Sequence, residues 1–191
     1  MKRYPPFDPP EYVDWEPDPD LVEAFAARLT EHDDRASRID ALDQDDRFDL
    51  YAGMVRTRLH DIMLKRWVRQ GALSKAWLGT GEEAVTVGAV HALDRDRDVV
   101  APMIRNAGAL PEMGMPLEDV FHGVFATARS TTGGRDLHFG DLDYGVLQPV
   151  SHVGDMVPVV AGVALGPAES RRPLRGVPGL HGGRAGTARS H

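Results

Sequence analysis

The chain has 191 residues, of which 42% are hydrophobic and 27% are charged, a composition typical of a globular domain with its own core. It contains no cysteine, which excludes disulfides and thiolate metal ligands, and its formal net charge of −7 argues against nucleic acid as a partner. Because no apolar run approaches membrane-spanning length and the first residues lack the apolar core of a signal peptide, we expect a soluble, cytoplasmic protein with no membrane partner.

The first region, residues 1–44, is expected to be an extended acidic arm with one short helix. Prolines and acidic residues dominate residues 1–20, which argues for an extended conformation. Residues 20–31 place Leu21, Phe25 and Leu29 on one face of a helix that Asp18 or Asp20 can cap, and a polar stretch follows. The aromatic residues of the arm either anchor a partner or are incidental; they are Tyr4, Phe7, Tyr12 and Trp15.

A long helix is predicted over residues 46–70. Asp45 and Asp46 suit its N-terminus and Arg69 its C-terminus, as the helix dipole favours, and Gly71 suits the position after its end. Apolar side chains recur at helical spacing on one side, and we expect that side to pack in the core. These side chains are Phe48, Tyr51, Ala52, Val55, Leu59, Ile62, Met63 and Trp67.

The central region alternates helices with short apolar runs. Gly81 introduces a helix with Glu82 and Glu83 in its first turn, and Val99–Ala101 follows as a short buried strand. A second amphipathic helix is predicted over residues 116–128. The next residues form a long polar loop, which is typical of a functional segment.

The remaining elements end the ordered part of the sequence. Val146–Val150 is a candidate strand, residues 151–154 form a turn, and Met156–Leu165 reads as an apolar helix rich in small residues. Helices alternating with short strands predict an α/β fold whose polar groups gather where a strand ends.

Four ordered segments resemble a known family. The segments read G-E-E-A-V-T-V-G, I-R-N-A-G-A-L, G-G-R-D-L-H-F-G and S-H-V-G-D-M-V-P-V-V-A-G-V-A-L. Together they resemble the alpha subunit of the first, thiamine-diphosphate-dependent component of 2-oxo acid dehydrogenase complexes, over roughly residues 45–166. The resemblance implies the N-terminal portion of a doubly wound, parallel-sheet domain with a helical lead-in and an incomplete sheet.

The resemblance also implies candidate site residues. Arg105 matches an arginine that meets the cofactor's diphosphate, a suitable role for a guanidinium, although the family's neighbouring tyrosine is Ile104 here. Ser151 and Val153 match a turn whose backbone contacts the aminopyrimidine ring. His138 matches a histidine in the loop that closes over the site. The plainer alternatives are a surface arginine paired with an acid and an ordinary loop histidine.

Two metal sites of the family are not carried over. The intact family holds magnesium with a G-D-G motif, and this sequence contains none. A potassium ion seen in some members is held by a Thr and a Gln, where this chain has Asp155 and Met156. We therefore expect no metal ligand among the candidates. The resemblance also implies no catalytic residue here, because the family's activating glutamate belongs to the beta subunit and its histidine for acyl transfer would lie beyond residue 191.

The composition changes abruptly near residue 166. Residues 167–191 contain five arginines against the single acid Glu169 and are rich in Gly, Ala and Pro. The codons possible for residues 176–183, read one base later, allow A-F-L-G-Y-T-G-D-G. We expect a frameshifted tail, with a natural disordered basic tail as the alternative.

The function implied by the resemblance is oxidative decarboxylation of a branched-chain 2-oxo acid or pyruvate, with acyl transfer to a lipoyl carrier. The implied partners are a dehydrogenase beta subunit, in a heterotetramer, and the lipoyl acyltransferase component. Because the family's activating glutamate belongs to the beta subunit, this chain cannot hold a complete site alone, and we expect it to be inactive even when it is mixed with a beta subunit. The alternatives are a non-catalytic module that binds a beta subunit, and a plain α/β ligand-binding domain.

Overall fold

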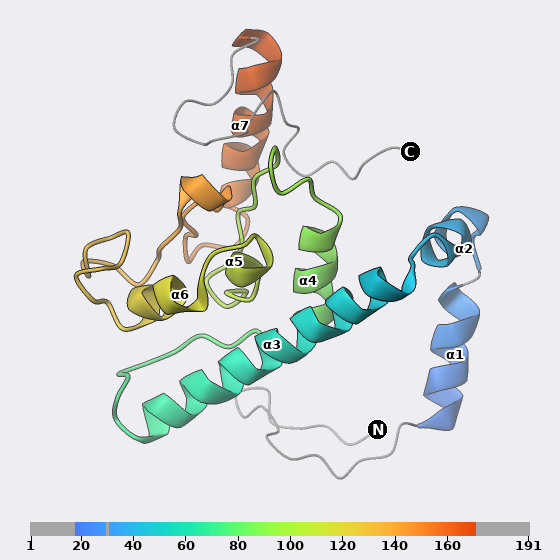
Figure 1. The fold of residues 1–191 in the computed structure, drawn as a ribbon, viewed down its shortest axis with the longest axis horizontal. Helices are drawn as coiled ribbons and strands as arrows, with labels where there is room; N and C mark the ends of the chain where they lie inside the picture. The colour runs from blue at the N-terminus through green and yellow to red at the C-terminus, as the bar shows by residue number, and fades with distance from the viewer. Residues whose placement is uncertain (1–17, 30, 171–191) are drawn as a thin grey trace. The chain divides into compact units, whose positions relative to one another are not determined.

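The computed structural model describes residues 18–29 and 31–170 (Figure 1). Contacts between residues divide the chain into two compact units, residues 1–52 and residues 53–191, and each unit is described by itself. The aromatic residues of the predicted arm and most of the predicted basic tail lie outside the described residues.

The first unit contains α1 (Pro19–Leu29), α2 (Asp33–Asp40) and the beginning of α3. The helix predicted over residues 20–31 is confirmed as α1, and the Asp18 carboxylate accepts a hydrogen bond from the Asp20 backbone at 3.1 Å. The polar stretch that follows forms a second helix, α2, which the sequence analysis did not predict. Acidic residues in the first turn and Arg38 in the last favour this helix, although it lacks an apolar face.

The long helix α3 (Gln44–Arg69) confirms the prediction over residues 46–70, and Gly71 beyond its end has a φ of 74°. The prediction that its apolar face forms the core was wrong for most of the helix. Phe48 is 68% exposed and Leu59 is 55% exposed, whereas the polar Asp61 is only 2% exposed. Helical periodicity identifies an apolar face, but the neighbours available to each face decide which one is buried.

The second unit has its core around three short helices. These are α4 (Glu83–His91), α5 (Ala109–Glu112) and α6 (Leu117–Val124), and α5 contacts both of the others (Figure 1). The helix predicted over residues 116–128 is confirmed with a shorter C-terminal end. The buried cluster consists of Val90, Ala109, Leu110, Met113, Met115, Val120, Phe139 and Val146.

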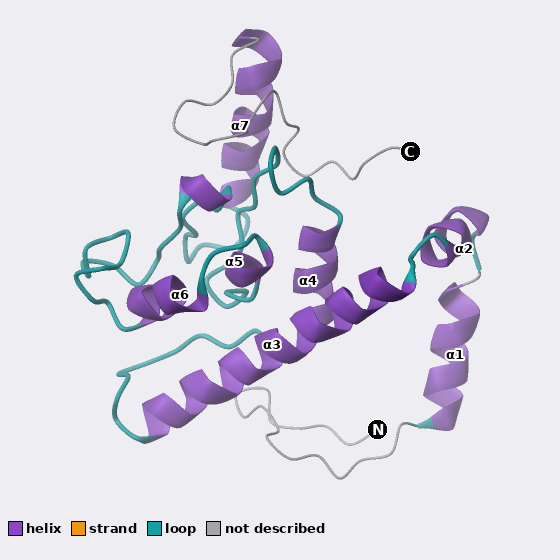
Figure 2. Cartoon of the chain, viewed as in Figure 1, coloured by secondary structure: helices purple, strands orange, loops and turns teal. Residues whose placement is uncertain are grey.

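In the described residues, the predicted strands are reduced to isolated bridges at Val146, one parallel with Val100 and one antiparallel with Asp141. Val100 and Val146 form a parallel bridge, in which the Val100 N–H donates to the Gly145 carbonyl at 2.8 Å and the Leu147 N–H donates to the Val100 carbonyl at 2.9 Å. No strand occurs in the residues that the structure describes (Figure 2). The described part is therefore helical, which is consistent with an incomplete α/β fold but does not confirm the parallel sheet.

Two further elements complete the described chain. A short 3-10 helix, η1 (Leu142–Tyr144), lies within the predicted polar loop. The predicted helix Met156–Leu165 is confirmed as α7 (Met156–Ser170), which continues four residues into the expected tail beyond residue 166. Nothing among the described helices combines the length and the apolar character needed to cross a membrane.

Candidate functional site

An open cleft of about 340 Å³ in the second unit brings together residues from two of the predicted site segments. His138 and Ser151 both line it, and we call it the Ser151 cleft. The other lining residues are Lys75, Trp77, Ala126, Gly134, Arg135, Asp136 and Leu137. The predicted polar loop and the predicted turn thus meet, although 13 positions separate His138 from Ser151.

A chain of three side chains runs along this cleft. The His138 ring lies 2.6 Å through Nε2 from the Ser151 hydroxyl oxygen and 2.8 Å through Nδ1 from Oδ1 of Asp136. The same Asp136 oxygen accepts a hydrogen bond from the His138 backbone N–H at 2.9 Å. The backbone hydrogen bond and then the ring hydrogen bond of His138 lower the pKa of Asp136 from its ordinary value of 3.8, so this carboxylate, like an ordinary aspartate, is ionised at neutral pH.

Aromatic and cationic groups border the same histidine. The Trp77 ring lies 6.2 Å from the His138 ring, centroid to centroid, at an angle of 46°. The Lys75 ammonium stands 5.0 Å from the Trp77 ring centroid, within the range of a cation–π interaction. The Ser151 cleft therefore offers a flat aromatic wall beside hydrogen-bonding groups, an arrangement suited to a planar ring.

Glycine geometry fixes the loop that carries His138. Gly133 and Gly134 have φ values of 62° and 77°, which disfavour other residues. A Cβ at Gly134 would lie 2.4 Å from the Ala126 carbonyl oxygen, so the loop folds back closely on the residues after α6. The Thr132 hydroxyl also donates to the Asp136 carbonyl at 2.8 Å. These contacts define the position of the Asp136 and His138 backbone.

Arg105 lies elsewhere in the second unit and does not line the Ser151 cleft. Its Nε is 3.6 Å from a carboxylate oxygen of Glu82, and both side chains are a little under half exposed. Asn106 donates to the other Glu82 oxygen at 2.8 Å, so one carboxylate serves two neighbours. The pairing with an acid that the sequence left as the alternative for Arg105 is therefore present.

Val153 also does not join the cleft. Its side chain is 78% exposed on the turn between Ser151 and α7. In the same turn, His152 and Asp155 form a loose pair with 3.8 Å between Nδ1 and Oδ2. The described residues hold no group of three or more His, Cys, Asp or Glu side chains that could ligate a metal.

Sequence reasoning missed the buried polar contacts that support this region. Arg58 donates to Glu83 at 2.6 Å, and Glu83 also accepts from the Gly81 backbone at 3.0 Å. Burial opposes ionisation of Glu83, but the hydrogen bonds with Arg58 and the backbone outweigh it and lower its pKa. Thr80 similarly donates to Asp61 at 2.9 Å. The sequence signal that could have indicated these contacts is the pair of acids, Glu82 and Glu83, that follows Gly81 at the start of α4.

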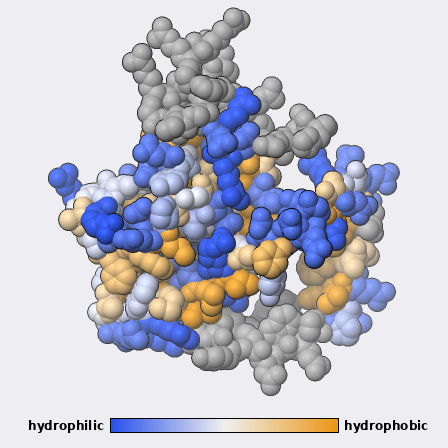
Figure 3. All heavy atoms as spheres, in the orientation of Figure 1, coloured by the Kyte–Doolittle hydropathy of each residue, from blue (hydrophilic) through white to orange (hydrophobic). Residues whose placement is uncertain are grey.

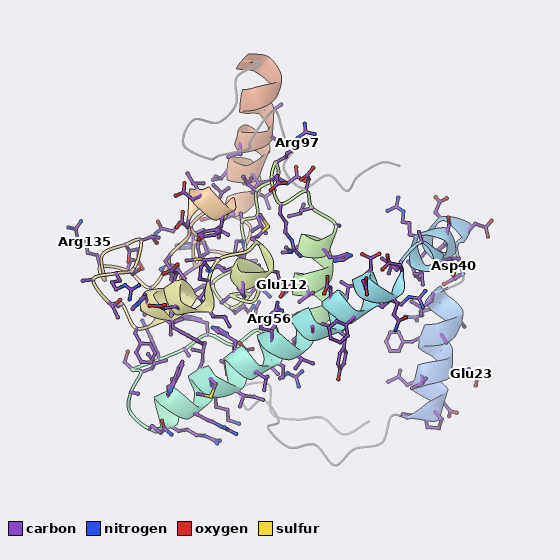
Figure 4. All side chains as sticks on the ribbon, viewed as in Figure 1. Glu23, Asp40, Arg56, Arg97, Glu112 and Arg135 are labelled. Atoms are coloured by element: carbon purple, nitrogen blue, oxygen red, sulfur yellow. The ribbon has the colours of Figure 1, made fainter. Side chains whose placement is uncertain are left out.

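A second arginine of α3 makes a comparable contact. Arg56 and Glu112 point toward one another from α3 and α5 (Figure 4) and form a hydrogen-bonded ion pair. In contrast, the Arg135 side chain points away from the rest of its loop (Figure 4). The arginines Arg56 and Arg58 of α3 thus pair with acids of other helices, whereas the charged residues that line the Ser151 cleft include Lys75, Arg135 and Asp136.

Comparison with known proteins gives three findings. A family model described as "Dehydrogenase E1 component" matches residues 51–174, which include all four of the segments quoted above. The 2-oxoisovalerate dehydrogenase subunit alpha of Bacillus subtilis (strain 168) is 34% identical over 120 residues, covering 61% of this chain and 36% of that protein.

The 2-oxoisovalerate dehydrogenase subunit alpha 1, mitochondrial, of Arabidopsis thaliana is 29% identical over 116 residues, which is 60% of this chain and 24% of that protein. The aligned part of the chain thus spans about a third or less of the length of these curated relatives.

Proposed function

The chain belongs to the dehydrogenase E1 component family, and we propose that it forms part of a 2-oxo acid dehydrogenase alpha subunit that uses thiamine diphosphate to decarboxylate a branched-chain 2-oxo acid or pyruvate. The observation that carries this proposal is the meeting of His138 and Ser151 in one cleft. The similarity to 2-oxoisovalerate dehydrogenase alpha subunits favours the branched-chain substrate.

The Ser151 cleft fits the pyrimidine half of the cofactor. Its volume of about 340 Å³ is ample for one planar ring, and Trp77 and His138 supply flat walls for it. In this proposal, the Ser151 backbone and hydroxyl orient the ring, and His138 orients Ser151. Val153 does not line the cleft and has no part in this arrangement. When bound, thiamine diphosphate supplies the carbanion chemistry, and the protein positions it and excludes water.

The diphosphate half has weaker support. Arg105 pairs with the Glu82 carboxylate, which would compete with a diphosphate for the guanidinium, and it lies outside the Ser151 cleft. The magnesium that accompanies this cofactor does not fit the residues present, since the sequence has no G-D-G and the described residues form no metal-binding group. We assign no step to a metal on this chain.

The proposed partners follow from a site that is divided between this chain and a beta subunit. A beta subunit would contribute the glutamate that activates the aminopyrimidine, in a heterotetramer, and the lipoyl acyltransferase component would receive the acyl group. Apolar surface interrupts the polar surface on the face in view (Figure 3), and Val85, Val157 and Leu165 are 75%, 70% and 60% exposed in the second unit. Such exposed apolar side chains are compatible with subunit contacts.

The test combines the purified chain with a 2-oxoisovalerate dehydrogenase beta subunit, thiamine diphosphate and magnesium chloride. We expect a stable complex and no decarboxylation of 2-oxoisovalerate by the chain alone. Release of carbon dioxide by the chain without a beta subunit would contradict the division of the site. Failure of the two chains to co-purify would contradict the assignment as an alpha subunit.

A second function is favoured by the pairing of Arg105 with Glu82 and by the poor magnesium fit. The chain would then bind a beta subunit without contributing to catalysis. Co-purification with the beta subunit but without retention of thiamine diphosphate is the result that this alternative predicts.

A further inference from the structure

We propose that Asp136 is a positioning residue that fixes His138 with its proton on Nδ1, so that the Ser151 hydroxyl donates to Nε2 and presents only lone pairs to a ligand in the Ser151 cleft. The preferred ligand group there is an N–H donor, such as the amino group of an aminopyrimidine. The choice of ligand rests on the proposed function, whereas the proton arrangement rests on geometry alone.

The first step concerns the proton on His138. An ionised carboxylate only accepts hydrogen bonds, so the 2.8 Å contact between Asp136 Oδ1 and His138 Nδ1 requires a proton on Nδ1. The bond from the His138 backbone N–H to the same oxygen holds the carboxylate beside the ring. Neutral His138 is therefore held as the Nδ1–H tautomer, and its Nε2 becomes an acceptor.

The second step concerns the hydroxyl of Ser151. Its oxygen lies 2.6 Å from His138 Nε2, and an unprotonated Nε2 leaves the serine as the donor. A hydroxyl has one proton, so the remaining capacity of Ser151 Oγ is two lone pairs. A carbonyl or carboxylate oxygen placed against Ser151 would find no donor there, whereas an amine would find an acceptor.

The third step is that Asp136 controls the direction of the hydrogen bond between His138 and Ser151. With the proton on Nε2 instead, His138 would donate to Ser151, and the serine hydroxyl would be free to donate into the cleft. Asp136 thus determines whether Ser151 acts on a ligand as an acceptor or as a donor. Because its carboxylate is about half exposed, removing it tests proton placement with little direct loss of packing.

The neighbouring turn offers a matched control. Asp155 pairs with His152 at 3.8 Å, beyond hydrogen-bonding distance, and both side chains are largely exposed. An Asp155→Ala variant therefore removes a similar charge near a histidine without touching the chain of hydrogen bonds at Ser151. Changes seen in Asp136→Ala and not in Asp155→Ala report on the Asp136 contact itself.

The experiment is long-range ¹H–¹⁵N NMR of the imidazole nitrogens in the full, unliganded chain at about pH 8.5, above the ordinary histidine pKa of about 6.5. The eight histidines are resolved by comparison with a His138→Gln variant. We expect His138 to be predominantly Nδ1–H in the wild type and in Asp155→Ala, and to shift toward Nε2–H in Asp136→Ala.

Two results would overturn the proposal: an Nε2–H form of His138 in the wild type, or an unchanged His138 spectrum in Asp136→Ala. The wild-type spectrum alone tests the predicted tautomer of His138, even if the Asp136→Ala variant does not fold. Because no cofactor is present in this experiment, a failure of thiamine diphosphate to bind would count against the proposed function and leave the tautomer result standing.

Discussion

At the scale of single residues, His138 shows what a motif can and cannot specify. Its place in G-G-R-D-L-H-F-G identified it as a candidate, and the turn motif identified Ser151. Neither motif predicts that the two side chains meet or that Asp136 holds the ring between them. Those contacts depend on how the loop folds back at Gly134, which sequence spacing does not determine.

Glu83 gives a residue-scale prediction about acid stability. Glu83→Gln should lower the free energy of unfolding at neutral pH by about 1–3 kcal/mol, because the buried Glu83 loses its charge-assisted hydrogen bond with the partly exposed Arg58. The pKa of Glu83 is lowered in the folded state, so its contribution is present above the ordinary value of 4.5 and is lost as pH falls through the folded value. Urea denaturation at several pH values should therefore show the two proteins converging in acid.

A matched variant sharpens this prediction. Glu23 lies on α1 and is exposed, so Glu23→Gln should change the free energy of unfolding by less than about 0.5 kcal/mol at every pH. An equal effect of the two substitutions, or a difference between wild type and Glu83→Gln that grows in acid, would contradict the role assigned to Glu83.

At the scale of elements, α3 shows that helical periodicity predicts a helix but does not determine which of its faces is buried. The sequence predicted its length and ends to within two residues, since acids and arginines at its termini and Gly71 beyond it are local signals. It did not predict that Thr57, His60 and Asp61 face inward. Long-range partners such as Thr80 and Glu83 decide that orientation, and a helical pattern contains no information about them.

Two leucines on α3 test this orientation. Leu64 is 3% exposed and Leu59 is 55% exposed, so Leu64→Ala should cost about 2–5 kcal/mol and Leu59→Ala less than about 1 kcal/mol. Thermal unfolding followed by circular dichroism measures both. If the substitution at Leu59 were the more costly one, the predicted apolar face would be the buried face after all.

Glycines in two helices provide a second pair of variants. A Cβ at Gly123 in α6 would lie 2.4 Å from the Phe139 ring, whereas a Cβ at Gly88 in α4 meets nothing within 4 Å. Gly123→Ala should therefore destabilise the protein by about 1–3 kcal/mol through overpacking. Gly88→Ala should stabilise it by about 0.5–1 kcal/mol, because alanine is the better helix former. A stabilising Gly123→Ala would show that α6 does not pack closely on Phe139.

At the scale of the whole molecule, the sequence predicted the family correctly, whereas the parallel sheet stays a prediction. In the described residues, the predicted strands survive only as isolated bridges of Val146 with Val100 and with Asp141. The ordered motifs identify the family through local segments, whereas a sheet requires chain segments that come together from far apart. The proposed cofactor site follows the same rule: the Ser151 cleft, its proposed pyrimidine side, lies within the second unit, and the other groups are proposed to come from a partner.

The most direct test of the proposed site is the affinity of thiamine diphosphate for the chain assembled with a beta subunit, measured by isothermal titration calorimetry with His138→Ala and His152→Ala. We predict saturable binding that His138→Ala weakens by about tenfold or more, equivalent to about 1.4 kcal/mol, and that His152→Ala leaves unchanged. Equal affinities for the two variants, or no binding to the wild-type assembly, would contradict a cofactor site at the Ser151 cleft.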